Sequence, residues 1–184
     1  MDPARLLHAL DFAAKKHRDQ RRKNAEASPY INHPIAVAAV LAGEGGVSDE
    51  TTLLAAALHD TVEDTQTTFE ELERHFGLDV SGLVRELTDD KSRPKDERKH
   101  LQVQHARQSS AQAKAIKIAD KVCNIRDITE CPPAGWGLER RLEYLVWSEQ
   151  VVAGCRGVNP RLDQVFDQAL ARARGALSSG TDRG

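Results

Sequence analysis

The chain has few aromatic residues, few cysteines and no long apolar run. Aromatic residues make up only 4% of the 184 residues, and no alternating β-branched stretch reaches strand length, which disfavours an all-β fold. The three cysteines, Cys123, Cys131 and Cys155, are odd in number and lack metal-ligand spacing. They indicate reduced thiols in a cytoplasmic protein. No segment approaches the roughly 18 uninterrupted apolar residues of a membrane span.

Charge of neither sign is in large excess. The formal net charge is −2 and no large basic block is present, which argues against a nucleic-acid partner. The N-terminus also lacks the charged-then-apolar pattern of a signal peptide. We therefore expect a cytoplasmic protein with a small-molecule partner and no membrane or nucleic-acid partner. The oligomeric state is left open.

Helix-forming residues dominate, and apolar residues recur at helical spacing. Leu6, Leu7, Leu10 and Ala13, for example, form one stripe among charged residues. The pattern predicts an all-α bundle of roughly nine helices, over residues 3–18, 34–43, 49–61, 69–76, 78–88, 94–107, 111–129, 138–154 and 160–174. Residues 1–175 then form a single domain, and residues 176–184, rich in Ser and Gly, are expected to be a disordered tail.

The run ALHDTVEDT at residues 57–65 is the most informative segment. On a continuous helix, His59 would lie one turn from Glu63, and Asp60 one turn from Asp64. The preceding residues, 52–58, are apolar apart from Thr52 and favour a helix that enters the core. An imidazole and carboxylates at the end of such a helix are costly to bury unless something offsets their charge. A divalent cation is one such partner.

Two further residues could complete a metal site. His33 precedes a proline just ahead of a predicted helix, and Asp120 interrupts the apolar stripe of another. Together with His59 and Asp60 they would supply two imidazoles and two carboxylates, and would leave coordination positions open for water, as a hydrolytic metal site requires. These ligand types suit Mn, Fe, Co or Zn, and their spacing does not choose among them.

The same residues also permit an interpretation without a metal. Asp120 can pair with Lys117 or Lys121, and His33 can cap a helix. The location of the His-Asp pair and of Asp120 within apolar helices favours a shared metal.

Four runs, in this order along the chain, carry a family resemblance. They are RRKNAEASPYINHP at 21–34, ALHDTVEDT at 57–65, TDDKSRPKDERK at 88–99 and KIADKVCNIRDI at 117–128. The chain resembles the HD-domain phosphohydrolases, and specifically the Mesh1-like small alarmone hydrolases related to the hydrolase half of Rel/SpoT proteins.

This resemblance implies an all-α fold, a Mn2+ ion held by His33, His59, Asp60 and Asp120, and removal of the 3′-pyrophosphate from guanosine alarmones. The products would be GDP or GTP and pyrophosphate. It also implies a hydrolase domain without a synthetase or regulatory extension.

The resemblance further suggests roles for residues around the metal. Glu63 and Asp64 would be the catalytic pair, one accepting a proton from water and the other orienting it, and the sequence does not tell which is the base. Expected substrate contacts are Arg22 and Lys23 at the base, Lys91 and Lys95 at the 3′ phosphates, Asn124 and Asp127 on the face of Asp120, and Arg140 with Tyr144 at the other end of the nucleotide. A solvated charged face is the alternative for the lysines.

Two other functions would use the same site. Mesh1-like proteins also remove the 2′-phosphate of NADPH, and the short insertion at residues 24–27 is Mesh1-like. A non-catalytic alarmone sensor is the third possibility, disfavoured because it would not need both the metal ligands and the Glu-Asp pair. The preference among pGpp, ppGpp, pppGpp and NADPH does not follow from the sequence.

Overall fold

A computed structural model describes residues 2–179, which contain helices and no strand. The elements are α1 (Pro3–Lys16), α2 (Asn32–Ala39), the π-helical segment η1 (Val40–Glu44), α3 (Glu50–Leu58), α4 (Thr61–Asp64), α5 (Phe69–Phe76), α6 (Leu78–Leu87), α7 (Lys95–Ala106), α8 (Ala111–Glu130), α9 (Leu138–Ala153) and α10 (Pro160–Ser179). The predicted all-α class is confirmed. The three cysteines form no disulfide. No helix in the described range is long and apolar enough to cross a membrane.

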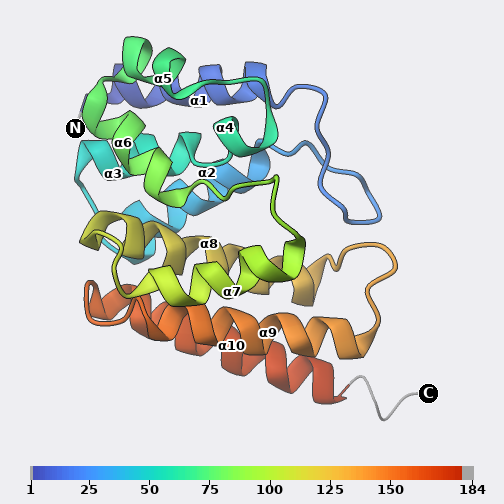
Figure 1. Ribbon diagram of the computed structural model, residues 1–184. Coiled ribbons are helices and arrows are strands. Elements are labelled where there is room, and N and C mark those ends of the chain that lie inside the picture. The colour runs from blue at the N-terminus through green and yellow to red at the C-terminus, as the bar shows by residue number, and fades with distance from the viewer. Residues whose placement is uncertain (1, 180–184) are drawn as a thin grey trace.

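Helices α3 and α8 form the centre of the fold (Figure 1). The Asp49 side chain caps α3 by accepting a hydrogen bond from the Thr52 amide at 2.9 Å, and every residue from Thr52 to Leu58 is buried. Helix α8 packs against α2, α3, α6, α9 and α10. These two buried helices bring the His-Asp pair and Asp120 into the interior.

The predicted helix at 49–61 is interrupted in the structure. Helix α3 ends at Leu58, and His59 and Asp60 form a turn before the short helix α4. The Thr61 hydroxyl donates to the Leu58 carbonyl at 2.7 Å, and His59 Nδ1 donates to the Ala56 carbonyl at 2.8 Å. These side chains satisfy carbonyls that the end of the helix leaves without a helical partner. The His-Asp pair therefore lies at a junction between helices.

Two other boundaries correct the sequence-based expectation. Helix α2 begins at Asn32, so His33 lies in its first turn and not ahead of it. Helix α10 continues to Ser179, so residues 176–179 are not a disordered tail. The reason is packing, because Leu177 is only 5% exposed and belongs to the core. Residues 180–184 of the expected tail lie outside the described residues.

Two connections meet on one side of the bundle. The segment between α1 and α2 and the segment between α8 and α9 both project to the right in Figure 1. The Lys23 carbonyl accepts a hydrogen bond from the Ala134 amide at 2.7 Å, and Asn24 forms a β-bridge with Pro133. This contact joins the connections beside the polar residues of α8.

The core makes a direct prediction about stability. Phe166 on α10 is fully buried, so Phe166→Ala should reduce the free energy of unfolding by about 3–5 kcal/mol. Urea denaturation measures the change. Leu78→Ala, at a side chain that is 69% exposed, should change it by less than about 0.5 kcal/mol. Equal losses in the two variants would contradict this description of the core.

Candidate active site

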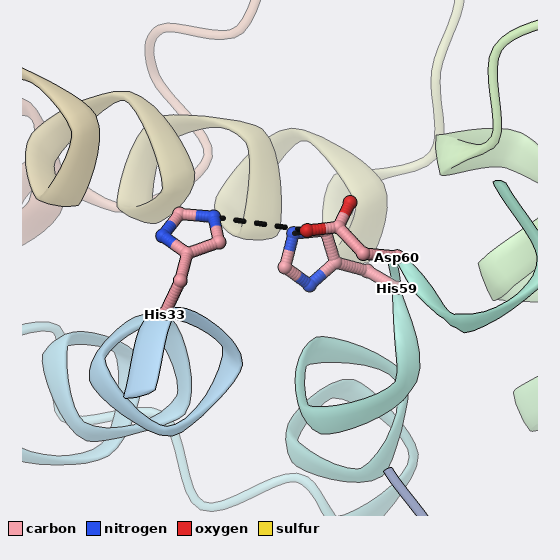
Figure 2. A group of neighbouring side chains, drawn as sticks. All are labelled: His33, His59 and Asp60. Carbon is pink, nitrogen blue, oxygen red and sulfur yellow. Dashed lines mark ion pairs between the residues drawn. The ribbon is translucent and has the colours of Figure 1, made fainter. Parts of the chain in front are cut away.

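Three side chains that can bind a metal meet where α2 approaches the end of α3. Figure 2 shows His33 on α2 facing His59 and Asp60, with α8 passing behind them. One donor atom from each residue lies within 4.8 Å of the others. His59 Nε2 is 3.2 Å and His33 Nε2 is 3.9 Å from Asp60 Oδ2. Both imidazoles are buried.

Asp120 joins this group from α8. Its Oδ1 atom lies 3.0 Å from His33 Nε2 and accepts a hydrogen bond from Asn124 Nδ2 at 2.7 Å. Its Oδ2 atom pairs with the buried ammonium of Lys121 at 2.8 Å. The fold thus brings all four predicted ligands together. The fold also forms the Asp120–Lys121 ion pair, which the interpretation without a metal allowed. The ion pair and a metal site are therefore compatible.

The electrostatics of the cluster reflect opposite charges held in the interior. Burial opposes the charged imidazole, yet the carboxylates of Asp60 and Asp120 raise the pKa of His59 to about 9. Burial likewise opposes the charged carboxylates, but His59 lowers the pKa of Asp60, and Lys121 and His33 lower that of Asp120. Each charge is stabilised by the opposite charges beside it.

The donor set fits a divalent cation. His59 Nδ1 donates to the Ala56 carbonyl, so its Nε2 atom is the one that faces the Asp60 carboxylate. A proton on Nε2 holds the ring and the carboxylate together at 3.2 Å, and a divalent cation between the two atoms can take the place of that proton. A backbone carbonyl at Nδ1 is also the usual arrangement around metal-binding histidines.

Tyr30 is a site residue that the sequence analysis missed. Its hydroxyl donates to Asp60 Oδ2 at 2.6 Å. Burial raises the pKa of Tyr30, and the nearby Asp60 and Asp64 raise it further, so the hydroxyl stays protonated as a donor. The available signal was its place three residues before His33, in a run already singled out.

Glu63 lies on α4, next to the cluster. Its Oε2 atom accepts a hydrogen bond from the Asp89 amide at 3.2 Å, and its Oε1 atom is 3.5 Å from Arg98 Nη1. Burial raises its pKa to about 7; the Asp89 amide opposes this, and repulsion from Asp89, Asp60 and Asp64 adds to it. A carboxyl group with this pKa can exchange a proton near neutral pH.

Asp64 is held at both carboxylate oxygens. Its Oδ2 atom accepts a hydrogen bond from Gln20 Nε2 at 2.9 Å, and its Oδ1 atom pairs with Lys91. Lys91, which we expect at the 3′ phosphates of a substrate, pairs with this carboxylate in the structure. Gln20 had not been singled out from the sequence.

His33 and Asp64 line a cleft with a cavity volume of about 650 Å³. Its lining includes five of the predicted substrate contacts: Arg22, Lys23, Asn124, Asp127 and Tyr144. Arg22 Nη2 pairs with Asp127 Oδ2 at 2.5 Å and contacts Asn124 Oδ1 at 3.2 Å. Its guanidinium lies 5.6 Å from the centre of the Tyr30 ring. These residues form one connected network along the cleft.

A second hollow of about 550 Å³, lined by both basic and acidic side chains, adjoins the cleft and shares Lys23, Trp136 and Tyr144 with it. The remaining predicted contacts, Lys95 and Arg140, line this hollow. Burial lowers the pKa of Lys95, as do the positive charges of Arg140, Lys99 and Lys23. These cations lie close enough to repel one another, and carboxylates, among them Asp96 and Glu139, share the lining of the hollow.

Comparison with known proteins places this site in a family. The HD domain profile matches residues 9–145, which include all four predicted ligands. The chain belongs to the HD-domain family. This HD-domain chain is 54% identical over 175 residues to the guanosine-3′,5′-bis(diphosphate) 3′-pyrophosphohydrolase MESH1 of Xenopus tropicalis, across 92% of this chain and 98% of that protein. It is 53% identical to MESH1 of Homo sapiens, across 95% and 97% of the two chains.

A solved structure agrees with this assignment. It is described as a metazoan orthologue of SpoT that hydrolyses ppGpp, and it matches this HD-domain chain with a TM-score of 0.90 at 49% identity, over 96% of this chain and 98% of the other. The resemblance to Mesh1-like and Rel/SpoT hydrolase domains is confirmed.

Tyr30 gives a test of the cluster that does not depend on turnover. A divalent ion held by the cluster should bind about 10–100-fold more weakly in Tyr30→Phe, because Asp60 loses the donor that orients it. Isothermal titration calorimetry measures the affinity. Tyr144→Phe removes the other tyrosine hydroxyl of the cleft and should leave the affinity unchanged. Wild-type affinity in Tyr30→Phe would show that its hydrogen bond does not support a metal site.

Proposed function

We propose that this chain hydrolyses the 3′-pyrophosphate of guanosine alarmones, converting ppGpp and pppGpp to GDP and GTP with release of pyrophosphate, in the cytoplasm. The observation that carries the proposal is the identity of 50–54% to MESH1 enzymes over nearly the whole chain. The buried cluster of two histidines and two aspartates beside a nucleotide-sized cleft supports it.

The proposed cofactor is one Mn2+ ion held by His33, His59, Asp60 and Asp120. Mixed nitrogen and oxygen ligands favour such an ion over Mg2+, which prefers oxygen ligands alone. When bound, the ion would acidify a water molecule and draw negative charge from a phosphate oxygen.

Glu63 and Asp64 would divide the proton chemistry. Both Asp64 oxygens are occupied, by Gln20 and Lys91, which suits a group that orients water. Glu63 is held only by longer contacts, and its pKa of about 7 suits a group that accepts a proton. We assign the base to Glu63 and the orienting role to Asp64.

The cleft and the second hollow would hold different parts of the nucleotide. The flat guanidinium of Arg22 can stack against the guanine base, and Asn124 can bond a ribose or phosphate oxygen. Lys23, Lys95 and Arg140 would offset the phosphate charges. The water oxygen bonds to the proximal phosphorus of the 3′ group, the bond from that phosphorus to the 3′ oxygen breaks, and the 3′ oxygen takes up a proton.

The test separates the three candidate functions. Purified protein is incubated with Mn2+ and either ppGpp or NADPH, and released pyrophosphate or phosphate is measured, with Mg2+ and EDTA as parallel conditions. We expect GDP and pyrophosphate from ppGpp, with Mn2+ more effective than Mg2+ and no activity in EDTA. Phosphate release from NADPH alone would establish the second function. Tight ppGpp binding without any turnover would establish a sensor.

Asp64 provides a specific prediction. Asp64→Ala should bind Mn2+ and ppGpp normally but turn over several orders of magnitude more slowly, because water loses its orienting group. Calorimetry and pyrophosphate release measure the two quantities. Asp11→Ala, at an exposed carboxylate on α1, is the matched control and should keep the wild-type rate. A near-normal rate in Asp64→Ala would remove this residue from the mechanism.

A further inference from the structure

A chain of hydrogen bonds connects the end of α1 to the carboxylate of Asp64. His17, the C-terminal cap of α1, is only 2% exposed. Its Nδ1 atom lies 2.7 Å from Gln20 Oε1, and Gln20 Nε2 lies 2.9 Å from Asp64 Oδ2. These hydrogen bonds connect residues that are 47 positions apart in the sequence, and they end at a proposed catalytic group.

The direction of each bond follows from the chemistry of the groups. A carboxylate oxygen can only accept, so the Gln20 amide nitrogen must face Asp64. The amide oxygen then faces His17, and it too can only accept. His17 must therefore donate through Nδ1. Rotating the amide by half a turn would set its oxygen against the carboxylate and its N–H groups against the Nδ1–H of His17, so both neighbours fix the orientation of Gln20.

The backbone holds this arrangement in place. The backbone amide of Gln20 donates to the backbone carbonyl of His17 at 2.9 Å. The backbone carbonyl of Gln20 accepts from the backbone amide of Tyr30 at 3.1 Å. The rings of His17 and Tyr30 lie 4.9 Å apart, tilted by 33°. Tyr30 itself donates to Asp60. One segment, residues 17–30, thus reaches both Asp60 and Asp64.

The imidazole of His17 is a costly way to fill a core position. Its Nε2 atom is buried and has no hydrogen-bond partner. An unsatisfied buried polar atom costs free energy that a ring without nitrogen would avoid. Packing alone therefore does not explain a histidine at this position. The hydrogen bond from Nδ1 to Gln20 explains the histidine.

The opposite side of Asp64 is held less firmly. Lys91 pairs with Oδ1, but its side chain is 48% exposed, and ion pairs of exposed side chains contribute little. Gln20 reaches Asp64 from the less exposed side. The amide is therefore the stronger constraint on the orientation of the carboxylate.

We propose that His17 and Gln20 are positioning residues that hold Asp64 in the orientation needed for hydrolysis. This inference rests on the proposed function, since it assigns the two residues to that reaction. Neither residue contacts a proposed metal ligand through its side chain, so metal binding should not change. Gln20 lines the cleft, but its amide oxygen and nitrogen face His17 and Asp64, so we expect the effect in turnover and not in nucleotide binding.

The test compares Gln20→Leu and His17→Phe with wild type in the Mn2+-dependent hydrolysis of ppGpp. We expect kcat to fall about 10–100-fold in both variants, because a misplaced catalytic group costs about this much, while KM and Mn2+ affinity change less than about 2-fold. Gln112→Leu is the matched control. Gln112 Nε2 donates to Asp49 Oδ2 at 2.8 Å, a bond of the same kind at the N-terminus of α3, and its loss should leave kcat unchanged.

A double variant separates positioning from a general loss of structure. In an Asp64→Ala background, Gln20→Leu should change the single-turnover rate less than about 2-fold, because no carboxylate is left to hold. A multiplied loss in the double variant would overturn the proposal. If Gln20→Leu fails to fold, Gln20→Glu keeps the size and the acceptor for His17 but removes the donor to Asp64. The kcat of Gln20→Glu should fall at least as far as that expected for Gln20→Leu.

The experiment also distinguishes a failure of the proposed function from a failure of the positioning role. No pyrophosphate release by the wild-type protein would overturn the proposed function, and this inference with it. Normal wild-type turnover with an unchanged kcat in Gln20→Leu would overturn the positioning role alone.

Discussion

The structure depends on opposite charges that are buried where the end of α3 meets α8. Two imidazoles, two carboxylates and the Lys121 ammonium lie together in the interior. Such groups are tolerated away from water only when each has a partner with good geometry. Helices α2, α3 and α8 must therefore approach one another at this point. The largely apolar surfaces of α3 and α8 supply the packing that makes this approach favourable.

The break between α3 and α4 separates the proposed ligands from the proposed catalytic acids. A continuous helix would place His59, Asp60, Glu63 and Asp64 on neighbouring ridges. The turn at residues 59–60 instead directs Asp60 toward the two imidazoles and lets α4 carry Glu63 and Asp64 beside the cluster. Their surroundings then differ. Glu63 has longer contacts and a raised pKa, and Asp64 contacts Gln20 at one oxygen and Lys91 at the other.

Sequence reasoning predicted the features that depend on local pattern. Helical periodicity located most of the helices, and the His-Asp pair within an apolar run indicated the buried cluster. It missed Tyr30 and Gln20 because their bonds to Asp60 and Asp64 cross 30 and 44 positions of sequence. Spacing rules describe neighbours on one helix, not a connection folded against another helix.

The errors have similar causes. Residues 176–179 were expected to be disordered from their composition, but Leu177 packs into the core and continues the helix. The break after Leu58 arises from side-chain bonds of His59 and Thr61 to the backbone, which compete with the helix at residues of ordinary helical propensity.

The central claim is that the buried cluster holds one divalent ion. Equilibrium dialysis against Mn2+, combined with thermal unfolding, tests it most directly. Wild-type protein should bind one ion per chain and gain thermal stability as Mn2+ increases, because the site exists only in the folded state. Asp60→Asn should lose both effects, while Asp90→Asn, at an exposed acid, should keep them. Mn2+ binding by Asp60→Asn with wild-type affinity, or none by the wild-type protein, would contradict the account.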